Sequence, residues 1–111
     1  MPVLNNSQFS TQEVRTGLIR RIVYTPNLMS AILNISGGPW SHHEEPHYNP
    51  HEQTCYIVSG EIIFFCEDEP EQNLQAGDML FVPSGKKHTI RFLTKTARLV
   101  DSFYPLREDF L

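Results

Sequence analysis

Histidines and carboxamides cluster in one short stretch of this chain. His47, Asn49, His51 and Gln53 are spaced by two residues, which in an extended segment directs all four side chains to one side. Imidazole nitrogen and carboxamide oxygen are suitable ligands for a borderline divalent ion such as Zn, Ni, Fe or Mn. Pro50 prevents regular strand pairing there, so the alternative is a polar surface loop with solvated histidines.

A further histidine stands far along the chain. His88 follows a Pro-Ser-Gly turn and opens an apolar run, in which Ile90 and Phe92 share its side. A histidine in this position is often only a hydrogen-bonded core residue. A metal site that gathers its ligands from two hairpins also needs a histidine at this position.

A carboxylate on an apolar strand face is the second chemical signal. Asp101 alternates with Leu99 and Phe103, and burying a carboxylate is costly unless it is paired, hydrogen-bonded or used. An ion pair with the nearby Arg107 is one explanation. The other is that Asp101 points into a pocket, where apolar surroundings raise its pKa towards acid/base chemistry.

The elements that position these residues are short strands, because no stretch shows convincing 3.6-residue periodicity. Such strands between turn residues predict an all-β sandwich, jelly roll or barrel in a single domain. Residues 1–12 form a polar arm before the β-domain 13–111, and Ser10–Glu13 favours one helical turn. The predicted strands are Gly17–Tyr24, Ser30–Ile35, Thr54–Val58, Glu61–Cys66, Asp78–Val82, Thr89–Leu93 and Arg98–Phe103.

Ser59-Gly60 is interpreted as a two-residue hairpin turn. Cys55 then faces Phe64, and the two cysteines are diagonal neighbours about 7–8 Å apart, which is long for a disulfide. Both thiols are therefore predicted to be free. One apolar face of this hairpin lines the interior, and a second layer, a second subunit or the N-terminal arm covers the other. If a second subunit covers this face, the protein is a homodimer.

Composition excludes several partners. The chain has 111 residues, 40% hydrophobic and 20% charged, and a net charge of −4. The charge gives no electrostatic case for binding nucleic acid. No apolar run approaches the roughly 20 residues of a membrane span, and the first residues lack the layout of a signal peptide. We expect a cytoplasmic protein with no nucleic-acid or membrane partner.

The histidine-rich stretch resembles the first motif of the cupin family. That motif reads His-x-His, three or four residues, Glu, six residues, Gly. This chain has His47, Gln53 in the Glu position, and Gly60 after six intervening residues. The segment from Gly77 to His88 resembles the second motif: Gly, five residues, Pro-x-Gly, two residues, His. Both motifs occur in order, and with their strands they cover residues 30–103.

This resemblance implies the cupin double-stranded β-helix, a jelly-roll barrel. It also implies a divalent metal ion as cofactor (Zn, Ni, Fe or Mn) with four ligands: His47, Asn49, Gln53 and His88. Asn49 stands where most cupins have their second histidine, and carboxamide binds borderline metals more weakly than imidazole. Three outcomes are open: Asn49 is a weak ligand, His43 or His51 replaces it, or the metal is lost.

The tail resembles that of the small pectin-degradation cupins, which open the ring of unsaturated monouronates released by pectin and alginate lyases. Asp101, Phe103 and Arg107 match their Asp-x-Phe-x-x-x-Arg triplet, which implies that these three residues are catalytic. Arg107 would bind the carboxylate of a sugar-acid substrate, Asp101 would move the proton and Phe103 would form an apolar floor. The metal ion would polarise sugar oxygens.

Other functions suit the same fold. One is an iron-dependent dioxygenase or an isomerase of another small polar substrate. Another is a non-catalytic cupin that binds a small molecule, as the missing histidine at position 49 would suggest. Cys55 on the interior face leaves thiol chemistry open, although a packed free cysteine explains it as well.

Overall fold

The computed structural model describes residues 3–8, 10–47 and 50–111, which form short strands and two 3-10 helices. In this part of the chain, no helix has the length and apolarity needed to cross a membrane. The elements are η1 (Asn6–Gln8), β1 (Gln12–Arg15), β2 (Leu18–Tyr24), β3 (Met29–Ile35), β4 (Glu52–Ser59), β5 (Glu61–Cys66), β6 (Gln72–Gln75), β7 (Met79–Val82), β8 (His88–Phe92), β9 (Ala97–Tyr104) and η2 (Glu108–Phe110).

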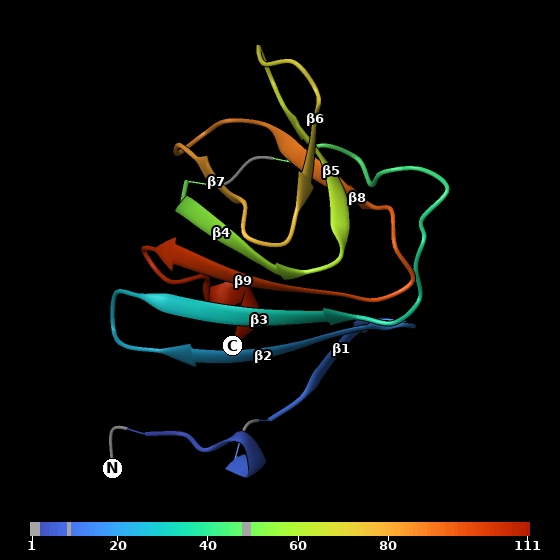
Figure 1. Ribbon diagram of the computed structural model, residues 1–111. Helices are drawn as coiled ribbons and strands as arrows, with labels where there is room; N and C mark the ends of the chain where they lie inside the picture. Colours follow the sequence, from blue (N-terminus) through green and yellow to red (C-terminus); the bar gives the residue numbers. More distant parts are fainter. Residues whose placement is uncertain (1–2, 9, 48–49) are drawn as a thin grey trace.

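The strands form two antiparallel sheets (Figure 1). One has six strands in the order β1-β2-β3-β9-β4-β7, and the other has three in the order β6-β5-β8. Strands adjacent in the larger sheet are often distant in sequence, since β9 lies between β3 and β4. This is the jelly-roll architecture, and it confirms the predicted all-β fold.

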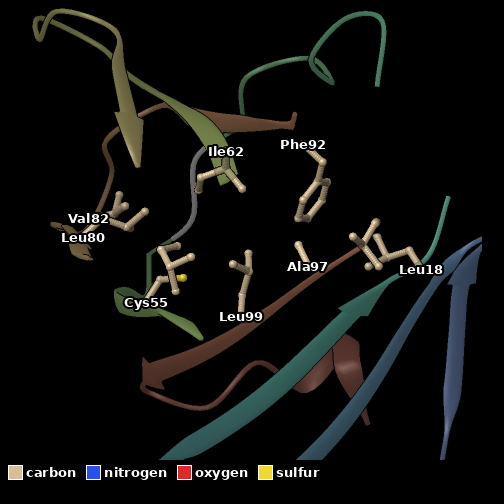
Figure 2. Close-up of a cluster of buried hydrophobic side chains, with 10 residues drawn as sticks. Leu18, Cys55, Ile62, Leu80, Val82, Phe92, Ala97 and Leu99 are labelled. Atoms are coloured by element: carbon tan, nitrogen blue, oxygen red, sulfur yellow. The ribbon is translucent and has the colours of Figure 1, made fainter. Parts of the chain in front are cut away.

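Strand alternation fills the space between the sheets. On β9 the side chains of Ala97, Leu99, Asp101 and Phe103 are buried, whereas the residues between them are more exposed. Figure 2 shows Leu99 and Ala97 of β9 directed towards Ile62 and Phe92 of the smaller sheet. A second apolar cluster joins β3 and β9 to the C-terminal segment: Met29, Ala31 and Phe103, with Ile22, Leu106 and Phe110 packed against them.

The predicted hairpin at Ser59-Gly60 is wrong. β4 pairs with β7 and β9, whereas β5 pairs with β6 and β8, so Gly60 carries the chain from one sheet to the other. It has φ +85°, and a Cβ there would lie 2.5 Å from Cβ of Ala97. The cysteines are therefore not paired across a hairpin, since Cys55 lies opposite Leu80 and Asp101 and Cys66 opposite His88. Both thiols are free, as predicted.

Two strands were absent from the prediction. β6 is a polar, largely exposed run without apolar alternation, and it is a strand because β5 pairs with it. β1 includes Gln12 and Glu13, which pair with Arg20 and Ile19. The helical turn expected at Ser10–Glu13 is therefore wrong.

The outer face of β4 and β7 is apolar and uncovered in this chain. Met79 and Phe81 are 68% and 75% exposed, and Tyr56 and Val58 are about 40% exposed. The N-terminal arm does not cover them, because η1 lies beside β2, where Arg21 donates a hydrogen bond to Asn6 (Nη1 to Oδ1, 2.8 Å). The described residues of the arm, 3–8 and 10–12, therefore do not cover this face.

Candidate functional site

A cavity of about 190 Å³ lies inside the barrel and receives side chains from both sheets. It borders both apolar clusters, because Leu99 belongs to one, Phe103 belongs to the other, and both line it. Asp101 lies between these two residues on β9 and also lines the cavity. The strand alternation seen in the sequence thus places a carboxylate between two apolar walls.

Asp101 is held by its neighbours on the sheet. It lies opposite Cys55 of β4 and Ala31 of β3 and is only 7% exposed. Burial raises its pKa to about 6, although hydrogen bonds from Cys55 and Gln53 and the positive charge of Arg107 act in the opposite direction. A carboxyl with a pKa near 6 can accept and return a proton close to neutral pH.

Arg107 lines the same cavity from the residue that precedes η2. Its ion pair is with Asp109 rather than Asp101: Nη2 donates to Oδ2 at 2.7 Å and Nε to Oδ1 at 3.3 Å. This hydrogen bonding lowers the pKa of Asp109. The guanidinium carbon also lies 5.4 Å from the ring centroid of Phe103. Asp101, Phe103 and Arg107 thus share one cavity.

His47 and His88 form a short antiparallel bridge beside it. Each backbone N–H donates to the carbonyl of the other, at 3.0 and 2.9 Å, and the ring centroids are 4.6 Å apart. Nδ1 of His88 lies 3.1 Å from the carbonyl of Lys86. The tautomer that donates this hydrogen bond leaves Nε2 free for a ligand. Burial lowers the pKa of His88, which favours the neutral ring that binds metals.

Gln53 supplies a third candidate ligand for a metal ion. It lies on β4 opposite Phe103 and lines the cavity with the two histidines. Since its amide nitrogen hydrogen-bonds Asp101, its oxygen remains available to a cation. Two imidazoles and a carboxamide oxygen suit a borderline divalent ion. The predicted ligands His47, Gln53 and His88 all line this one cavity, and their role as metal ligands stays a prediction.

The fourth predicted ligand, Asn49, lies outside the described residues. Of the alternatives for its place, His43 packs against Phe65, with the ring centroids 4.5 Å apart and the rings tilted by 54°, and its Nδ1 contacts the carbonyl of Glu44. Neither His43 nor His51 is among the described residues that line the cavity. Within the described ranges, no three His, Cys, Asp or Glu side chains form a group that could hold a metal ion. A metal would therefore depend on carboxamide oxygen.

Sequence reasoning missed several cavity residues, chiefly Arg20, Trp40 and Phe110. Arg20 lies on β2 between Leu18, which is buried, and Ile22, which packs against the second cluster. A charged residue that alternates with apolar ones is the same signal that identified Asp101. Arg20 could have been found in that way.

The Cupin domain family matches residues 38–103, which is more than half of the chain. Together with the jelly-roll barrel and the cavity inside it, this match shows that the chain belongs to the cupin family. The family predicted from the two motifs is thereby confirmed.

Among its relatives is the pectin degradation protein KdgF of Dickeya dadantii (strain 3937). The two are 28% identical over 102 residues, which cover 90% of this chain and 89% of that protein. The structure of KdgF from Halomonas sp. is 29% identical with a TM-score of 0.83, covering 96% of this chain and 97% of the other. The relation to pectin-degradation cupins is thus supported in sequence and in structure.

Other solved cupins show how general the fold is. An RmlC-like cupin from Shewanella frigidimarina NCIMB 400 is 29% identical, with a TM-score of 0.85 and coverage of 97% of this chain and 94% of the other. Oxalate decarboxylase of Bacillus subtilis, which has Mn(II) centres, is 22% identical, with a TM-score of 0.76. This chain covers 29% of that larger protein, so the likeness to it concerns the fold alone.

Proposed function

We propose that this cupin is a metal-dependent enzyme of lyase or isomerase type. Its substrates would be the 4,5-unsaturated monouronates that arise when pectin or alginate is broken down. The observation that carries the proposal is the shared cavity, in which the buried Asp101 lies with Arg107, Phe103 and the two histidines. The similarity to KdgF proteins supports the choice of sugar acid.

His47, Gln53 and His88 would hold the divalent ion, with Asn49 as a fourth, weaker ligand. When bound, such an ion polarises hydroxyl or carbonyl oxygens of the sugar. The hydrogen bond between Gln53 and Asp101 fixes the amide so that its oxygen, rather than its nitrogen, is free for the cation.

Asp101 would carry the proton. Its carboxylate would accept the proton of the anomeric hydroxyl as C1 becomes a carbonyl and the bond between C1 and the ring oxygen breaks. The electron pair passes to the C5 enolate, and the same proton is returned to C4, which leaves a ketone at C5. No proton is gained or lost overall, and a carboxyl with a pKa near 6 suits both transfers.

Arg107 and Phe103 would position the sugar. Asp109 holds the Nε edge of the Arg107 guanidinium through two hydrogen bonds, which orients its remaining donors towards a carboxylate ligand. Phe103 is buried and lines the cavity, so its ring would provide an apolar surface beneath the sugar.

The test is an assay with unsaturated galacturonate made by a lyase, in which absorbance of the conjugated double bond is followed with and without chelator. We expect loss of absorbance above the enzyme-free rate, and loss of that activity in chelator and in Asp101→Asn. Asp68→Asn is the matched control, because Asp68 is exposed and lies outside the described cavity lining. Activity of Asp101→Asn equal to wild type would contradict the role of Asp101.

A second candidate is a non-catalytic cupin that binds a sugar acid. It is favoured by one observation, the lack of a three-residue group of His, Cys, Asp or Glu ligands among the described residues. This function predicts binding of galacturonate without turnover of the unsaturated uronate under any metal.

We also propose that the protein is a homodimer. β7 is an edge strand of the larger sheet, and its exposed Met79 and Phe81 adjoin Tyr56 and Val58 on β4. An apolar patch at a sheet edge favours association, and a second copy would cover it.

A further inference from the structure

Two arginines that are far apart in the sequence line the same cavity and contact the same aromatic ring. Arg20 extends from β2 and Arg107 precedes η2, and both line the cavity. Their guanidinium carbons lie 3.5 and 4.1 Å from the ring centroid of Phe110. Bringing two like charges together in a partly desolvated place is unfavourable unless an anion compensates them.

Only one of the two arginines has a carboxylate partner in the described structure. Arg107 is held by Asp109 through two hydrogen bonds. Arg20 donates from Nε to the neutral Oε1 of Gln12 at 2.8 Å, and within the described residues it forms no ion pair. Burial and the charge of Arg107 lower the pKa of Arg20, yet a guanidinium stays charged at neutral pH. Asp109 acts on Arg20 only at longer range, so within the described residues Arg20 is the guanidinium of the pair that has no carboxylate in hydrogen-bond contact.

Gln12 fixes this arrangement. Its Nε2 donates to the carbonyl of Phe110 at 2.7 Å, while its Oε1 accepts from Arg20. One side chain of β1 thus ties β2 to the C-terminal 3-10 helix. Because Nε is engaged, the two Nη groups of Arg20 remain for a ligand, and no hydrogen-bond partner for them lies among the described residues. A donor held in place before binding loses less entropy when a ligand arrives.

We propose that Arg20 is a specificity-determining residue that binds the carboxylate of a small organic acid together with Arg107. The sugar-acid nature of the ligand rests on the proposed function, whereas the preference for an anion rests on the two guanidiniums alone. Arg20 would make the cavity select an acid over the uncharged sugar with the same ring, because only the acid offers a carboxylate to the two Nη groups of Arg20. The alternative is that Arg20 only packs on Phe110 and ties β2 to the tail.

Trp40 offers a direct measurement, since it is the only tryptophan of the chain and lines the same cavity. Its fluorescence would be titrated with galacturonate and, separately, with galactose. Wild type should prefer galacturonate, and the preference should fall as salt is added. Arg20→Gln should weaken galacturonate binding about 10- to 100-fold, the usual range for a lost hydrogen bond to a charged group, and leave galactose binding unchanged.

Three variants separate binding from folding. Arg98→Gln is the matched control, because Arg98 also donates from Nε to a side-chain amide (Asn34 Oδ1, 2.7 Å) but is exposed and outside the described cavity lining. Arg20→Lys keeps the charge and should bind galacturonate with intermediate affinity. Gln12→Glu supplies Arg20 with an internal carboxylate and also loses the hydrogen bond to the carbonyl of Phe110. It should weaken galacturonate binding although the guanidinium is intact.

Thermal unfolding of each variant shows which ones are folded. Wild-type affinity for galacturonate in folded Arg20→Gln or Gln12→Glu, or no preference for the acid in wild type, would overturn the proposal. Acid-selective binding that needs Arg20 but gives no turnover of the unsaturated uronate would contradict the proposed function and leave this inference standing. Turnover of the unsaturated uronate by Arg20→Gln with an unchanged KM would contradict this inference and leave the proposed function standing.

Discussion

Cys55 and Asp101 lie directly opposite each other on β4 and β9, and the Cys55 thiol donates a hydrogen bond to the Asp101 carboxylate. Both side chains are almost completely buried, at 3% and 7% exposure. Burial, followed by the charge of Asp101, raises the pKa of Cys55 far above its ordinary value. The thiol therefore stays protonated and acts as a donor, which argues against thiolate chemistry at this residue.

The raised pKa of Asp101 gives the first prediction, for metal-free protein in chelator. The folded pKa of about 6 exceeds the ordinary 3.8, so the folded state holds the proton more tightly. The stability that results is present below pH 3.8 and is lost as pH rises through 6. It amounts to about 3 kcal/mol at most. Urea unfolding should show that Asp101→Asn gains stability relative to wild type between pH 4 and pH 7.5.

The control for this prediction is Asp109→Asn. Hydrogen bonding to Arg107 lowers the pKa of Asp109, so its ionised form stabilises the fold above pH 4. Asp109→Asn should therefore be less stable than wild type by a constant amount between pH 4 and pH 7.5, and this difference should shrink only as the pH falls below 4. A difference between Asp101→Asn and wild type that does not change with pH would contradict the argument.

Metal binding is expected to depend on the bridged histidines. His88→Ala removes a buried, neutral imidazole and should weaken binding of Ni or Mn at least 10-fold in calorimetric titrations. Its control is His42→Ala, because His42 is exposed and hydrogen-bonds Ser41. Asn49→His should strengthen binding, since imidazole is the better ligand. If His43→Ala or His51→Ala weakened binding as much as His88→Ala, Asn49 would not be the fourth ligand.

The exposed edge of the larger sheet should hold the dimer together. Phe81→Ser removes the ring that is 75% exposed, and the protein should then sediment as a monomer at concentrations where wild type is dimeric. Val23→Ser is a suitable control, as this residue is 45% exposed on β2, away from β7. A monomeric wild type would refute the proposal outright.

The two motif glycines Gly60 and Gly85 should differ in their tolerance of alanine. Both have positive φ, +85° and +81°, but a Cβ on Gly60 would meet Ala97 at 2.5 Å, whereas none of the described atoms lies within 4 Å of one on Gly85. Gly85→Ala should cost about 1–2 kcal/mol for the left-handed backbone alone. Gly60→Ala should cost roughly 1–3 kcal/mol more through overpacking. Equal midpoints in urea would show that the corner is not tightly packed.

Much of the fold and half of the candidate site could be predicted from the sequence. Strand alternation indicated that Asp101 would be buried with Leu99 and Phe103, and the structure has it so. The spacing of the two motifs brought His47, Gln53 and His88 to one cavity. The burial of Asp101 could be predicted because the face of a strand on which a side chain lies depends on the local two-residue period. The shared cavity of His47, Gln53 and His88 was expected only from the resemblance to the cupin motifs.

What only the tertiary structure decided is which strands and side chains meet. Ser59-Gly60 has the composition of a hairpin turn, yet β4 and β5 enter different sheets because their hydrogen-bond partners come from β7, β9, β6 and β8. Likewise, Arg107 pairs with Asp109 rather than Asp101, and Arg20 meets Phe110 from the other end of the chain. The sequence by itself determined the fold family and the inward-facing residues. Their partners followed only from non-local packing, which no local period encodes.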